Sequence, residues 1–293
     1  MNAWWWLPLL VGGCWGLNRM IRRVLAAPRV LELGVPDGLP WQAVRVPTAN
    51  GKTLFAWFIP AGDEAPALVV MHGWGGNAEM MLPLAAPLHA AGHALLLLDA
   101  RCHGRSDEDS FASLPRFAED IEAGLVWLAR QPGVDADRLG VVGHSVGAGA
   151  ALLAASRRPG IRAVVSIAAF AHPARMMRRW LEARRIPYWP LGAYILAYVQ
   201  WVIGHRFEAI APCRTIVRVP CPVLLVHGLA DETVPADEAR EIHAARRDDD
   251  VELLLVPGSH DAYGDVATQV GSLLAFLRRA LAGCGAPTRG GLG

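Results

Sequence analysis

Residues 139–156 read LGVVGHSVGAGAALLAAS, and this stretch decides the fold class. Its apolar beginning, Leu139–Gly143, predicts a buried strand, and Val146–Ser156 predicts a helix that follows directly. Between them Gly143–Gly147 reads GHSVG, a G-x-S-x-G sequence at a strand-to-helix turn. So sharp a turn leaves no room for bulky side chains two residues before or after the serine. The stretch predicts a nucleophile elbow with Ser145 at its tip. The alternative is a glycine-rich turn that only packs the helix closely on the sheet.

The rest of the chain alternates strands with helices. Such an alternation implies right-handed crossovers and a mostly parallel sheet covered by helices on both faces. We therefore predict a single α/β domain over residues 31–282, with a mostly parallel sheet. The predicted strands are 42–47, 53–60, 67–71, 94–99, 139–143, 163–168, 222–227 and 251–256, and the predicted helices are 79–91, 117–130, 146–156, 236–245 and 265–281.

One insertion, about residues 170–219, interrupts this alternation. It begins with a basic amphipathic stretch and is then uncharged over residues 186–205. The uncharged part is long enough for a transmembrane helix, but strands of one sheet flank it, and Pro187 and Pro190 break its beginning. We predict a helical cap over the active site. We expect its aromatic residues to form an apolar acyl pocket; these are Trp180, Tyr188, Trp189, Tyr194, Tyr198 and Trp201.

The N-terminal segment, residues 1–30, has the character of a membrane anchor. Residues 3–17 carry no charge, and Arg19, Arg22 and Arg23 follow. This run is shorter than the roughly 20 apolar residues that span a bilayer. Tryptophans with trailing arginines are typical of an anchor at the headgroup level, or of a marginal span with its C-terminal side in the cytoplasm. A cleaved signal peptide and a buried N-terminal helix are the alternatives.

We therefore expect a membrane-associated protein with its catalytic domain on the cytoplasmic side, a cytoplasmic protein being the alternative. The Gly-rich tail, residues 283–293, is expected to be flexible. Net charge is only +1, so no global basic field recruits nucleic acid. The five cysteines include no C-x-x-C pair, which disfavours a disulfide framework or a zinc site.

A serine hydroxyl needs a base within hydrogen-bond reach, and in this fold the acid and the histidine follow the serine, each after a strand. Asp231 stands in HGLAD, just after the predicted strand 222–227. His260 stands in PGSHD, just after the predicted strand 251–256. Both loops fall at carboxyl ends of parallel strands, on the same edge as Ser145. The order predicts a Ser145–His260–Asp231 triad.

Two other acids and nine other histidines compete for these roles. Glu232 would act only if the loop shifted by one residue. Asp261 adjoins the histidine and would have to curl back onto it. Of the ten histidines, His260 alone combines a late position with a loop after the last strand. We interpret His72, His103, His144 and His227 as packing or supporting residues.

An oxyanion hole needs backbone N–H groups aimed at the charge that develops on a carbonyl oxygen. We assign one donor to Val146, the residue after the serine. The loop after the strand 67–71 reads HGWGG, and its glycines allow close approach of a substrate to the backbone. We assign the second donor to Trp74 in this loop. The alternative is a plain glycine turn.

These motifs together resemble the α/β-hydrolase superfamily over about residues 31–281. They are HGWGG, DARCHGRS at residues 99–106, GHSVG, HGLAD and the Ser259-His260 loop. Within the superfamily the pattern resembles the membrane-anchored serine aminopeptidase-like, or Bem46-like, hydrolases, in which a hydrophobic N-terminal segment precedes the hydrolase domain. The resemblance implies the triad and oxyanion roles named above. Cys102 stands where glycine is frequent in this family's motif, a departure that concerns a loop and not the triad.

We therefore expect a serine hydrolase that cleaves a carboxylic ester. Ser145 attacks the carbonyl, His260 takes the proton, Asp231 holds the imidazolium, and water releases the acyl-enzyme. This chemistry requires neither a metal nor an organic cofactor. The expected partner is a small-molecule ester, and the cap and anchor suggest a lipid-like or long-chain acyl group. An amidase or peptidase, a thioesterase and a catalytically silent binding protein are the alternatives.

Overall fold

The computed structural model describes residues 7–247, 249–260 and 266–282. Three predicted features fall outside these ranges: residues 1–6 of the N-terminal segment, the alternative acid Asp261, and the tail 283–293.

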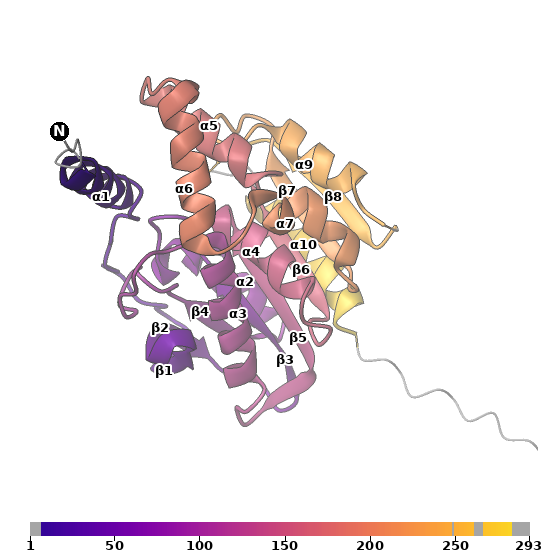
Figure 1. The fold of residues 1–293 in the computed structure, drawn as a ribbon. Coiled ribbons are helices and arrows are strands. Elements are labelled where there is room, and N and C mark those ends of the chain that lie inside the picture. Colours follow the sequence, from indigo (N-terminus) through magenta and orange to yellow (C-terminus); the bar gives the residue numbers. More distant parts are fainter. Residues whose placement is uncertain (1–6, 248, 261–265, 283–293) are drawn as a thin grey trace, which may run out of the picture.

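The described strands form one eight-stranded sheet in the order β1-β2-β4-β3-β5-β6-β7-β8 (Figure 1). β2 pairs antiparallel with both β1 and β4, and every other neighbouring pair is parallel. The predicted mostly parallel sheet is confirmed. The strands are β1 (Gln42–Thr48), β2 (Lys52–Ile59), β3 (Ala65–Met71), β4 (Ala94–Leu98), β5 (Val134–His144), β6 (Ala163–Ile167), β7 (Val223–Gly228) and β8 (Val251–Val256).

Helices cover both faces of this sheet. α3 (Leu114–Leu128), α4 (Val146–Ala155) and α9 (Ala236–Ala244) contribute to the hydrophobic cluster on one face. α2 (Leu82–Ala90) and α10 (Val266–Ala280) contribute to the cluster on the other face.

Adjacent residues of the central strands belong to opposite clusters. Leu68 packs with the α2 side and Val69 with the α3 side, and both are fully buried. Successive side chains of a strand point to opposite faces, so a strand covered on both sides must be apolar throughout. Polar side chains that could take part in a reaction are therefore expected in the loops at the strand ends.

The insertion between β6 and β7 is helical, as predicted. Its elements are α5 (Pro173–Ala183), η3 (Tyr188–Gly192), α6 (Ala193–Ile203), α7 (Phe207–Ile210), α8 (Pro212–Thr215) and η4 (Ile216–Arg218). The remaining short helical turns are η1 (Ala49–Gly51) and η2 (Ala78–Met81). In Figure 1, α5 and α6 rise from the top of the domain.

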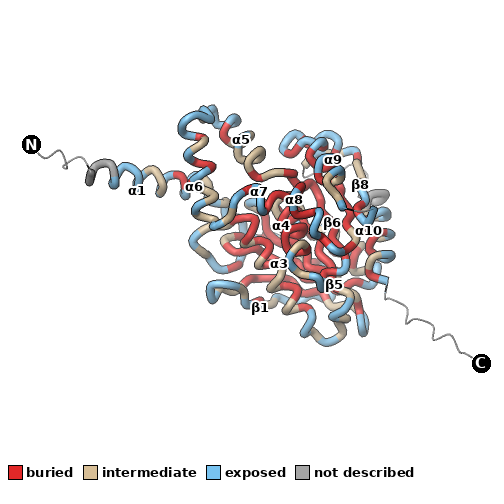
Figure 2. Tube along the Cα trace, turned by 45° about the vertical axis from the view of Figure 1, so that its right-hand side comes forward, coloured by how far each residue is buried: buried red, intermediate tan, exposed pale blue. Residues whose placement is uncertain are grey.

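α1 (Leu7–Val24) lies beside α6 (Figures 1 and 2). The Tyr194 hydroxyl donates to Asn18 Oδ1 over 2.7 Å, and Arg22 Nε donates to the Tyr198 hydroxyl over 2.7 Å. Ile21 is buried. Among the described residues, no helix combines the length and the hydropathy that a membrane crossing requires.

Candidate active site

Ser145 occupies a strained turn between β5 and α4. Its backbone has φ 53° and ψ −114°, outside the regions that L-residues favour, at a cost of order 1–3 kcal/mol. Gly147 makes the turn possible, because a Cβ there would overlap the His72 carbonyl oxygen and lie 2.7 Å from the Met71 carbonyl oxygen. The Ser145 N–H donates to the Ile167 carbonyl of β6 over 2.8 Å. The elbow therefore holds the serine side chain at the carboxyl edge of the sheet.

The structure brings Ser145, His260 and Asp231 together, although they are distant in the chain. His260 Nε2 lies 3.0 Å from Ser145 Oγ, and His260 Nδ1 lies 2.7 Å from Asp231 Oδ2. Asp231 and Ser145 are buried. With Nδ1–H donating to the carboxylate, Nε2 is free to accept the serine proton.

The loop after β7 fixes which acid meets the histidine. Asp231 Oδ1 accepts the N–H groups of Thr233 (2.9 Å) and Val234 (2.7 Å), which leaves Oδ2 for His260. An aspartate that accepts bonds from the backbone two and three residues ahead forms a stable turn around its own carboxylate. Glu232, the alternative acid, is exposed.

The loop after β8 is tied to the loop that carries the acid and to the elbow. Ala230 N–H donates to the Gly258 carbonyl over 2.9 Å. His144 Nε2 lies 3.0 Å from the His260 carbonyl oxygen and can bond it only as an N–H donor. These bonds orient the backbone that carries the imidazole.

The loop His72–Gly76, called here the oxyanion loop, passes close to Ser145. A Cβ on Gly73 would lie 3.1 Å from Ser145 Cβ. Among the described residues, neither the Trp74 N–H nor the Val146 N–H donates to an acceptor within the chain. The two predicted donors are thus available beside the candidate nucleophile.

His72 holds this loop in place, a role that the sequence left undefined. Nδ1 bonds the Gly73 carbonyl over 2.6 Å, and Nε2 accepts the N–H of Ala100, from the loop after β4, over 3.1 Å. Burial, aided by His103, lowers the pKa of His72 to about 3. His72 therefore stays neutral as the Nδ1–H tautomer. Its partner at Ala100 is 28 residues away, so local sequence could not reveal it.

Most of the cap aromatics lie at the surface, and none of the six lines the two pockets that the described residues form around His172 and around Phe111. Trp189 and Trp201 are 78% and 74% exposed, and Tyr188 and Tyr194 are exposed as well. Buried Tyr198 stacks between Tyr194 and Trp201, with ring centroids 6.2 and 5.9 Å away. The physical reason for this arrangement is the position of α1. It packs against the face of α6 that carries Tyr194 and Tyr198, so this face contacts α1 at the surface of the domain.

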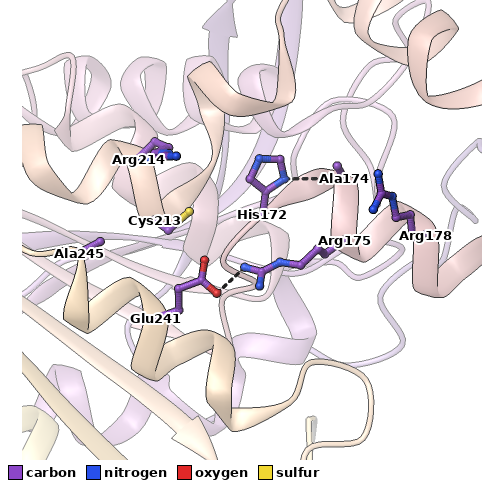
Figure 3. Close-up of a pocket in the computed structure, with 8 residues that line it drawn as sticks. All are labelled: His172, Ala174, Arg175, Arg178, Cys213, Arg214, Glu241 and Ala245. Atoms are coloured by element: carbon purple, nitrogen blue, oxygen red, sulfur yellow. Dashed lines mark hydrogen bonds and ion pairs between the residues drawn. The ribbon is translucent and has the colours of Figure 1, made fainter. Parts of the chain in front are cut away.

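A pocket of about 440 Å³ lies elsewhere, among α5, α8 and α9 (Figure 3). Its lining contains none of the five predicted site residues. Figure 3 shows the Arg175 guanidinium directed at the Glu241 carboxylate, 2.6 Å away. Three arginines and a glutamate line this pocket, whereas an acyl-binding site has a predominantly hydrophobic lining.

The sheet order, its parallel pairing and the serine elbow define the class of the protein, an α/β-hydrolase. A family model described as "Serine aminopeptidase, S33" matches residues 62–210. The uncharacterized protein Rv2307c of Mycobacterium tuberculosis is 30% identical over 223 residues, which cover 73% of this chain and 70% of the relative. The chain therefore belongs to the S33 serine aminopeptidase family of hydrolases.

Two solved structures share the fold. The Pyrococcus furiosus esterase Pf2001 superposes with a TM-score of 0.72 at 23% identity, over 87% of this chain and 98% of the esterase. A puromycin-hydrolyzing peptidase of Mycobacterium tuberculosis superposes with a TM-score of 0.65 at 20% identity, over 85% of this chain and 40% of the peptidase.

Proposed function

We propose that the protein is a serine hydrolase that cleaves carboxylic esters through Ser145, His260 and Asp231. The observation that carries this proposal is the unbroken hydrogen-bonded line from Asp231 Oδ2 through His260 to Ser145 Oγ, with distances of 2.7 and 3.0 Å. A serine needs such a base, and the base needs such an orienting carboxylate.

In the proposed reaction, Ser145 Oγ attacks the carbonyl carbon while its proton moves to His260 Nε2. The Trp74 and Val146 N–H groups receive the oxyanion. His260 then protonates the leaving alkoxide, which gives the alcohol and an acyl-Ser145. A water molecule, deprotonated by His260, releases the acid and restores the serine.

A peptidase or amidase with the same triad is the second candidate. The family description and the puromycin-hydrolyzing neighbour favour it, and the esterase neighbour favours ester cleavage. Paired substrates that share one acyl group, a p-nitrophenyl ester and a p-nitroanilide, discriminate the two. We expect the larger kcat/KM for the ester after correction for the intrinsic reactivity of each bond, with Ser145→Ala as the blank. A larger corrected value for the anilide would establish the second candidate instead.

We also propose that α1 attaches the protein to the surface of a membrane on the cytoplasmic side. Asn18 and Arg22 contact α6, and Val11 and Trp15 continue the same helical stripe toward the N-terminus. Val11 and Trp15 are 67% and 66% exposed. Figure 2 shows this part of α1 projecting from the domain. An exposed apolar helix segment that is followed by Arg19, Arg22 and Arg23 fits the headgroup region of an anionic bilayer.

Cosedimentation with phosphatidylglycerol vesicles tests this attachment. We expect Trp15→Ser to weaken binding at least about tenfold, because interfacial affinity scales with buried apolar area. Val217→Ser removes an exposed apolar side chain outside α1 and should bind as the wild type does. Equal binding of Trp15→Ser and the wild type would rule out α1 as the anchor.

The acyl group is proposed to be long or lipid-like, because the enzyme would take it from that surface. A p-nitrophenyl ester series from acetate to palmitate should show kcat/KM rising with chain length, measured in the presence of the same vesicles. A steady fall from acetate onward would exclude a lipid-like substrate.

A further inference from the structure

The segment after α1 packs against two loops, one of which, the oxyanion loop, lies beside Ser145. This strap, Pro28–Gly34, runs past the oxyanion loop and past the β4 loop, Asp99–Ser106. The contact with the oxyanion loop is close: a Cβ on Gly75 would lie 2.8 Å from Pro28 Cγ. Only glycine at that position lets the strap pack so tightly, and its φ of +73° also favours glycine.

Hydrogen bonds add to this packing on both sides of the strap. They run from Asn77 Nδ2 to the Val30 carbonyl (3.1 Å), from Arg29 Nη2 to the Ser106 carbonyl (3.0 Å), and from Leu33 N (2.8 Å) and Gly34 N (3.0 Å) to the Glu79 carboxylate.

Glu32, at the centre of the strap, points inward. Its side chain is fully buried, and its carboxyl group faces the carboxyl group of Asp99. Arg105 Nε approaches it to 2.8 Å from the more exposed side. A Cβ on Gly104 would overlap Asp99 Oδ2 and lie 2.6 Å from Glu32 Oε1, so the two carboxyl groups meet at this glycine. Two adjacent buried carboxylates would repel strongly, so this arrangement needs a proton between them.

Asp99 links the Glu32 carboxyl group to the chain beside the oxyanion loop. Its Oδ1 accepts the N–H of Ala78, just after the oxyanion loop, over 2.7 Å, and its Oδ2 accepts the N–H of Arg105 over 2.8 Å. Burial, together with the hydrogen bond to Glu32 and the charge of Glu32, raises the pKa of Asp99 to about 8. The Asp99 carboxyl therefore keeps its proton at neutral pH, where an exposed aspartate has lost it.

We propose that Glu32 is a positioning residue of the hydrolase: by sharing one proton with Asp99, it fastens the strap over the oxyanion loop and so keeps the Trp74 N–H aimed at the substrate. This proposal rests on the proposed function, because it assigns Glu32 a role in that reaction. Loss of the proton leaves two facing carboxylates, which push the strap away from the loop.

The site should therefore lose activity in alkaline solution. The positive groups that face the strap are the guanidinium groups of Arg29 and Arg105, and burial lowers the pKa of His72 and of His103 nearby. The other charged groups near the strap are Glu79, which accepts from Leu33 and Gly34, and Glu108, which faces Arg29. With a pKa of about 8, the share of molecules that keep the proton falls from about 75% at pH 7.5 to about 3% at pH 9.5.

Glu32→Gln tests the proposal, because an amide donates to Asp99 without a titrating proton. We measure kcat/KM for a p-nitrophenyl ester at pH 7.5 and 9.5, subtracting the rate of Ser145→Ala at each pH. The wild type should lose about 20-fold over this range, and Glu32→Gln less than about threefold. Glu79→Gln, which also touches the strap, is the matched control and should keep the wild-type loss. Glu32→Ala, which offers Asp99 no partner, should lose about tenfold already at pH 7.5, so that Gln rescues what Ala does not.

Urea unfolding supplies a readout that does not depend on catalysis. Between about pH 4 and 8 the folded wild type keeps a proton that the unfolded chain has released, so its stability should fall as the pH rises. Glu32→Gln should flatten this slope. An unchanged alkaline loss of activity in Glu32→Gln, or an unchanged stability slope, would overturn the positioning role while leaving Ser145-dependent hydrolysis intact. Absence of that hydrolysis at every pH would overturn the proposed function and the positioning role together.

Discussion

Replacing Asp231 by asparagine should disable the site through the tautomer of His260, without disturbing the fold. Asp231 Oδ1 accepts two backbone N–H groups, at 2.9 and 2.7 Å, so the amide oxygen must take that place. The amide nitrogen then stands where Oδ2 was, 2.7 Å from His260 Nδ1. An NH₂ group there can only donate, which forces the proton of His260 onto Nε2 and points it at Ser145.

In this tautomer, His260 cannot accept the serine proton. We expect kcat for a p-nitrophenyl ester to fall about 10⁴-fold, or about 5 kcal/mol of transition-state stabilisation. Glu232→Gln, one residue away and exposed, is the matched control and should keep the wild-type kcat. A kcat of Asp231→Asn within tenfold of the wild type, or an equal fall in Glu232→Gln, would show that Asp231 does not set the tautomer of His260.

Two further substitutions test the supports of the site. Gly147→Ala places a Cβ against backbone oxygens that cannot rotate away, and should cost about 3 kcal/mol in urea unfolding, whereas Gly12→Ala, with open space around it, should cost nothing; equal stability of the two would contradict the crowded elbow. Arg101→Met leaves buried Asp120 without its counter-charge and should cost about 3–5 kcal/mol at pH 8. Burial raises the pKa of the Asp120 carboxyl to about 6, so this group contributes less to the stability of the fold as the pH rises through that value and it ionises. The drop in Tm that Arg101→Met causes should therefore be smaller at pH 5 than at pH 8. Equal drops at the two pH values would contradict the role of Arg101 as the counter-charge of Asp120.

The sheet could be predicted because its strands are short apolar runs between turn residues. The first residues of some strands and helices could not be predicted, because local bonds between polar residues set them. β5 begins at Val134 and not at Leu139, since Arg138 bonds Asp135 and the carbonyl of Glu64 and so keeps a polar stretch extended. α3 begins at Leu114 and not at 117, because Ser113 caps its first turn.

In the candidate site, too, some residues could be predicted from the sequence and others could not. Motif and chain order suffice to predict Ser145 and His260. The choice of Asp231 over its neighbour depends on two backbone N–H groups, which spacing cannot reveal. Glu32 carries no motif and meets Asp99 only because the strap crosses the sheet edge, 67 residues earlier in the chain.

The position of the cap aromatics could not be predicted, for a different reason. An uncharged helix rich in tyrosine and tryptophan fits an inner pocket and an outer surface equally well by composition. The aromatic residues lie at the surface because α1 packs against α6, where Arg22 bonds the Tyr198 hydroxyl. Contacts between such distant segments are a property of the assembled fold.

The central claim, that Ser145 is a nucleophile activated by His260, is tested most directly by a fluorophosphonate and peptide mass spectrometry. We expect one phosphonyl adduct on the peptide that contains Ser145; it should form at least about 100-fold more slowly in His260→Ala and be absent in Ser145→Ala. An unlabelled wild type, or an adduct that persists in Ser145→Ala, would contradict the claim.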